Sequence, residues 1–96
     1  MPHTLAIHKV AKYALWKDAF QSNESIATRK AAGEKSYMLL RTIDDPNKFA
    51  LLNEWEDMNK LRAFMQSEKL RKLQANAGVV GKPEIYIFAE VEKGSI

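Results

Sequence analysis

The order of strand-like and helix-like segments along the chain constrains the fold of this sequence more than any other feature. Four stretches rich in β-branched and aliphatic residues are typical of strands: Thr4–Val10, Glu34–Ile43, Lys48–Glu56 and Ile85–Val91. Between the first and second stretches, and again between the third and fourth, apolar residues recur at helical spacing. The chain therefore reads β-α-β-β-α-β. This is the ferredoxin-like α+β order, in which two helices cover one face of a four-stranded antiparallel sheet.

The boundaries of the two helical segments carry their own signals. The first runs from Lys12 to Ala32 and should end at Gly33, with a bend expected in its polar middle, Gln21–Ser25. Asp57 is placed to cap the second segment, and Ser67 predicts a break within it.

The connections are short and contain no linker. Asp44–Asn47 is a tight-turn sequence that joins two strands into a hairpin, and Ala77–Pro83 is a loop punctuated by glycine and proline. Glu92–Ile96 is a polar tail. We expect a single domain over residues 1–96.

The strands carry apolar residues on both faces, although the helices cover only one. Met38 and Leu40, for example, alternate with Tyr37 and Leu39. A monomer rarely leaves so large an apolar surface open, and a chain of 96 residues without cysteine has little else to reinforce it. We therefore predict a homodimer whose sheets pack face to face; the alternative is that one face is simply half exposed.

Composition excludes several classes of protein. A net charge of +3 is too small for the basic footprint of a nucleic-acid binder. No apolar run approaches the roughly 18 residues of a membrane span, and no secretion signal is evident, so a cytoplasmic location is expected. With no cysteine and only His3 and His8 as histidines, the sequence predicts neither a metal site nor a cofactor.

Three residues stand out as candidates for chemistry. His8 lies within the first strand and is a candidate general base or hydrogen-bond donor, the alternative being a structural histidine. Asn53 and Glu54 interrupt an apolar strand on opposite faces, so at least one points toward a covered surface. Glu54 is thus a second catalytic candidate and Asn53 a substrate-binding one, unless they pair with neighbours for structural reasons.

Two further residues are candidates for substrate binding. Trp55 has the area to form one wall of an aromatic pocket, or else packs in the core. Arg41 is the one charged residue within Leu39–Ile43, and it would hold either a substrate oxyanion or a carboxylate of the protein.

Several groups of residues also keep the order of a known family. They are Ile7–Val10 with Tyr13, Trp16-Lys17 and Phe20; Asp44–Asn47; Asn53–Trp55; Phe64 with Ser67 and Leu70; and Ala77–Val79 with Gly81 and Pro83. Together they resemble the antibiotic biosynthesis monooxygenase-like proteins of the dimeric α+β-barrel superfamily, over nearly the whole chain.

The resemblance implies a dimer whose sheets form a barrel, with a pocket inside each unit. Some members oxidise aromatic polyketides with oxygen and without metal or flavin, using Asn, Trp, Tyr and Arg side chains. Asn53, Trp55, Tyr86 and Arg41 are the matching types here. The haem-degrading branch pairs a helix histidine with an asparagine on the first strand, and this sequence has neither.

The leading hypothesis is a cofactor-independent monooxygenase-like dimer that binds a small aromatic or apolar molecule in an interior pocket. His8 or Glu54 would remove a proton, Arg41 and Asn53 would stabilise the oxyanion, and Trp55 would stack on the ring. The alternative is a non-catalytic small-molecule-binding or structural dimer. An RNA-binding module is a third reading, disfavoured by the mild charge.

Overall fold

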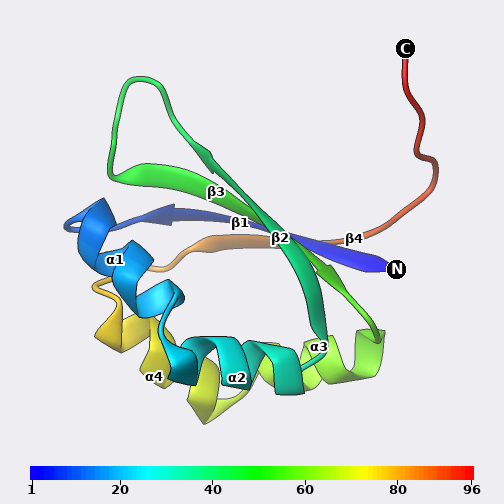
Figure 1. Ribbon diagram of the computed structural model, residues 1–96, viewed down its shortest axis with the longest axis horizontal. Helices are drawn as coiled ribbons and strands as arrows, with labels where there is room; N and C mark the ends of the chain where they lie inside the picture. The colour runs from blue at the N-terminus through cyan, green and yellow to red at the C-terminus, as the bar shows by residue number, and fades with distance from the viewer.

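A four-stranded antiparallel sheet carries all of the helices on one face in the computed structural model, which describes residues 1–96 (Figure 1). Its strands are β1 (Pro2–Lys9), β2 (Glu34–Arg41), β3 (Lys48–Trp55) and β4 (Glu84–Ala89). They lie in the order β2-β3-β1-β4, and every neighbouring pair is antiparallel. This confirms the predicted ferredoxin-like α+β fold.

Each helical segment of the sequence forms two helices. The first segment gives α1 (Tyr13–Phe20) and α2 (Asn23–Ala31), and the second gives α3 (Met58–Met65) and α4 (Glu68–Asn76). None of the four is long and apolar enough to cross a membrane.

A serine stands at each helix break. The Ser22 hydroxyl donates to the Ala19 carbonyl at 2.8 Å and accepts from the backbone N–H of Ser25, so one side chain ends α1 and caps α2. Ser67 does the same between α3 and α4. The break at Ser67 was predicted. A single helix with a bend was predicted over Lys12–Ala32, and this was wrong. The chain forms two helices there, because the Ser22 hydroxyl hydrogen-bonds backbone groups at the end of one and the start of the other.

Strict alternation along the strands separates two faces of the sheet. On β1 and β3 the side chains under the helices are buried: Thr4, Ala6, His8, Phe49, Leu51, Asn53 and Trp55. The other face, here called the open face, carries Met38, Leu40, Tyr86 and Phe88, each about half exposed. The chain therefore has an apolar face that its own helices do not cover, as its pattern predicted.

Two apolar clusters fill the layer between the sheet and the helices. One gathers Trp16, Phe20 and Phe49 near α1, and the other gathers Trp55, Leu61 and Phe64 near α3. The clusters are separate, and the space that both of them border is the site described next.

Candidate functional site

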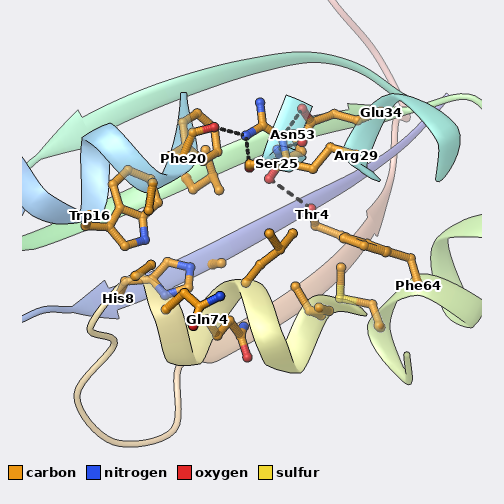
Figure 2. Close-up of a pocket in the computed structure, with 18 of the residues that line it drawn as sticks. Thr4, His8, Trp16, Phe20, Ser25, Arg29, Glu34, Asn53, Phe64 and Gln74 are labelled. Atoms are coloured by element: carbon orange, nitrogen blue, oxygen red, sulfur yellow. Dashed lines mark hydrogen bonds and ion pairs between the residues drawn. The ribbon is translucent and has the colours of Figure 1, made fainter. Parts of the chain in front are cut away.

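A cavity of about 310 Å³ lies between the helix-covered face of the sheet and the helices. Aromatic and aliphatic side chains from both clusters form most of its wall. Among them are Trp16, Phe20 and Phe64 (Figure 2), together with Trp55 and Leu73. This volume is at the lower end of the range of small-molecule sites. The cavity is thus large enough for a small, mainly apolar ligand.

His8 contributes the titratable imidazole of the cavity wall. The residue is 6% exposed, and its ring stacks on Phe49 with centroids 5.3 Å apart and lies 6.1 Å from the ring of Trp16. Nδ1 is buried without any hydrogen-bond partner. Burial among apolar groups disfavours the charged form and lowers the pKa of His8 to about 4. The imidazole is therefore neutral at pH 7, with unused hydrogen-bonding capacity.

A chain of hydrogen bonds fixes the opposite wall of the cavity. The indole Nε1–H of Trp55 donates to Thr4 Oγ1 at 2.9 Å, and the Thr4 hydroxyl donates to Asn53 Oδ1 at 3.3 Å. The amide Nδ2 of Asn53 in turn donates to the carboxylate of Glu34. This chain holds the Trp55 ring in one orientation and leaves the Asn53 amide engaged at both ends.

A buried ion pair completes this wall. Arg29 Nε donates to Glu34 Oε2 at 2.8 Å, and its Nη1 donates to the Ser25 hydroxyl at 2.9 Å and to the Phe20 carbonyl at 2.6 Å. The guanidinium also lies 3.7 Å from the centroid of the Phe20 ring. Both charges are thereby paired and hydrogen-bonded, which is the condition under which buried charges are tolerated.

Sequence reasoning missed Arg29, Glu34, Thr4 and Ser25. The available signal was the spacing of four between Ser25 and Arg29, which places both on one side of α2. It was weak, because an arginine in the last turn of a helix is ordinarily solvated and complements the helix dipole.

Of the predicted site residues, the structure brings His8, Asn53 and Trp55 together around the cavity. Glu54 and Tyr86 lie on the open face, because each occupies the other parity of its strand. Tyr86 donates its hydroxyl to Glu84 at 3.2 Å.

Arg41 has the parity of the helix-covered face but stands at the far end of β2. Its guanidinium there lies 4.9 Å from the centroid of the Tyr13 ring, away from the cavity wall. Arg41 is therefore not placed to contact an oxyanion bound in the cavity.

The fold and the cavity together define a small ferredoxin-like α+β protein in which one sheet and four short helices border a partly open cavity. The family model described as antibiotic biosynthesis monooxygenase matches residues 9–76, and the chain belongs to this family. No curated protein matches the chain.

Solved structures with the same fold support this placement. SnoaB, a cofactor-independent oxygenase from Streptomyces nogalater, is 16% identical over 96% of this chain and 94% of its own, with a TM-score of 0.75. A Bordetella bronchiseptica protein that carries the family name is 18% identical over 95% and 97% of the two chains, also with a TM-score of 0.75. At such identities the likeness concerns the fold.

Proposed function

We propose that this protein binds a small, flat, largely apolar molecule carrying a phenol or enol oxygen, and oxidises it with dioxygen without a cofactor. The observation that carries the proposal is a cavity with aromatic walls in which a neutral imidazole lacks a hydrogen-bond partner. Membership of the monooxygenase family and the description of SnoaB as a cofactor-independent oxygenase support it.

The fit of such a ligand follows from the two kinds of group in the wall. A buried polar group without a partner costs roughly 1–3 kcal/mol, and a ligand oxygen hydrogen-bonded to His8 would recover part of that cost. Trp55 and Trp16 offer flat apolar surfaces for ring stacking. The polar groups of the opposite wall are already paired with one another, so the remainder of the ligand is apolar.

The proposed reaction converts a phenol and dioxygen into a quinone and water. The O–H proton passes to His8, the phenolate gives one electron to dioxygen, and the two radicals combine to form a C–O bond at a ring carbon. The hydrogen on that carbon passes as a proton to the terminal peroxide oxygen, its bonding electrons form a carbonyl, and the O–O bond breaks to release hydroxide. The departing hydroxide takes the proton from His8 and forms water.

His8 is a weak base while the cavity is empty, since its pKa is about 4. A phenolate beside the ring stabilises the imidazolium and raises that pKa, so proton transfer and anion formation occur as a pair. The role of oxyanion partner therefore falls to protonated His8, with Trp55 as the stacking wall held by Thr4.

The alternative is a binding protein without oxygenase activity. The low pKa of His8 favours it, because an imidazole that resists protonation hydrogen-bonds a ligand oxygen without deprotonating it.

In the same proposal the working unit is a homodimer in which two open faces pack together. Only 16 of the 96 residues are buried in one chain, while Met38, Leu40, Tyr86 and Phe88 remain about half exposed. Pairing would bury these side chains and enlarge the small core.

The test uses 1-naphthol, whose oxidation by dioxygen gives 1,4-naphthoquinone and water. Binding is read from tryptophan fluorescence, since Trp16 and Trp55 both line the cavity, and turnover is read with an oxygen electrode. Ala6→Leu fills the cavity, whereas Ala50→Leu makes the same change on the open face. We expect Ala6→Leu to weaken binding at least about tenfold and Ala50→Leu to leave it within about twofold.

Binding with oxygen uptake supports the oxygenase, and saturable binding without uptake supports the binding protein. Equal loss of binding in both variants, or no binding by the unmodified protein, contradicts both functions. Far-ultraviolet circular dichroism of each variant shows that the fold is retained.

A further inference from the structure

We propose that His3, Glu54 and Glu90 on the open face form a binding site for one divalent transition-metal cation of the Zn²⁺ type. These three residues, here called the open-face triad, lie across the sheet from the cavity. The proposal is independent of the cavity and its ligand. It does bear on the proposed homodimer, because His3 lies opposite Phe88 in the β1–β4 pair, so the triad borders the surface that pairing would cover.

The strand register brings the triad together. His3 lies directly opposite Glu54 in the β1–β3 pair, and β4, the other neighbour of β1, is followed at once by Glu90. Two paired strands and the residue that follows a third thus bring one side chain each to the same point. All three ligand atoms lie within 4.8 Å of one another.

The distances in the triad suit coordination better than hydrogen bonding. His3 Nε2 is 3.4 Å from Glu54 Oε2 and 3.7 Å from Glu90 Oε1, and none of these atoms makes a hydrogen bond. A hydrogen bond of this kind would be about 2.7–3.2 Å long. Ligand atoms held about 2.0–2.2 Å from a tetrahedral zinc ion stand roughly 3.4 Å apart.

The negative charge of the two carboxylates in the triad also favours the binding of a cation. Two carboxylates face one imidazole, and no lysine or arginine pairs with Glu54 or Glu90. The side chains of His3, Glu54 and Glu90 are 20%, 31% and 40% exposed, so water screens this excess of negative charge only in part. A bound divalent cation would neutralise both carboxylates.

The donor atoms indicate the class of cation. One imidazole nitrogen with two carboxylate oxygens is a set that Zn²⁺ accepts, with a further position left for water or another ligand. Mg²⁺ and Ca²⁺ prefer oxygen ligands alone and are expected to bind much more weakly. No metal site was predicted from the sequence, because only cysteines and histidines were considered as ligands. In the folded chain, strand register brings two glutamates to a histidine.

The test is calorimetric titration of the untagged full chain with ZnCl₂, and separately with MgCl₂. Glu54→Gln removes one ligand charge at nearly constant size. Glu84→Gln makes the same change at an exposed glutamate on β4, outside the triad. We expect one Zn²⁺ per chain, binding at least about tenfold weaker in Glu54→Gln, and a change of less than about twofold in Glu84→Gln.

The melting temperature provides a second measurement. ZnCl₂ should raise it in the unmodified protein and in Glu84→Gln, and much less in Glu54→Gln, because a ligand that binds only the folded state stabilises it. No saturable Zn²⁺ binding by the unmodified protein would overturn the proposal. Zn²⁺ affinity that is equal in the unmodified protein and Glu54→Gln would overturn it as well.

Discussion

At the scale of single residues, the two histidines of this chain have opposite surroundings. His8 lies among aromatic rings with an unpaired nitrogen, whereas His3 faces two carboxylates on the other side of the sheet. The parity of β1 alone makes the difference, since the two residues are five positions apart. Apolar burial keeps the His8 ring neutral at pH 7, which suits the proposed hydrogen bond to a ligand oxygen.

The depressed pKa of His8 makes the stability of the protein depend on pH. Histidine in an unfolded chain takes up a proton near pH 6.5, but His8 in the folded protein does so only near pH 4. The unfolded state therefore binds more protons between these values. The free energy of unfolding should fall as the pH is lowered from 6.5 to 4, by up to about 3 kcal/mol.

Urea unfolding at a series of pH values measures this loss. His8→Phe keeps a ring of similar shape without a titratable group, and it should flatten the curve between pH 6.5 and 4. An equally steep curve in His8→Phe would show that another group causes the acid sensitivity.

At the scale of elements, the two helix breaks show which features could be predicted from the sequence and which could not. The break at Ser67 could be predicted because this serine precedes Glu68 and Lys69 at the start of a new helical turn. Ser22 makes the same local capping contacts, but it stands in a run of polar residues that is also compatible with a continuous helix, so the sequence did not distinguish a break from a bend. Strands and turns were predictable because runs of β-branched and aliphatic residues, and Pro46 in its turn, are local signals.

The candidate site was predictable only in part, for a related reason. Alternation along β3 showed that Asn53 and Glu54 face opposite ways, but which of them faces the cavity depends on how the helices cross the sheet. Asn53 proved to be the covered residue, held by Thr4 and Glu34. These partners lie 49 and 19 positions away in the chain, so no local pattern could connect them.

At the scale of the whole molecule, the helix-covered face carries the cavity and the open face carries the apolar surface proposed for dimerisation. A change on the open face should therefore alter assembly without altering the cavity. Leu40→Lys places a charge at a side chain that is 52% exposed in the single chain. We expect the unmodified 11.0 kDa chain to sediment as a dimer at micromolar concentration and Leu40→Lys to sediment as a monomer.

An unmodified chain that sediments as a stable monomer would rule out the dimer. If Leu40→Lys remains fully dimeric, another surface mediates the contact. We expect 1-naphthol binding to be unchanged in either case, because the proposed site lies on the opposite face of the sheet.

Nuclear magnetic resonance of the two histidine rings can show at the imidazole itself whether the cavity beside His8 binds a ligand. The protein is labelled with ¹⁵N at histidine and titrated with 1-naphthol, with His3 on the open face as the internal control. We expect the ring ¹⁵N signals of His8 to shift saturably while those of His3 stay in place. His8 signals that do not move at saturating 1-naphthol, or equal shifts at both rings, would contradict this expectation.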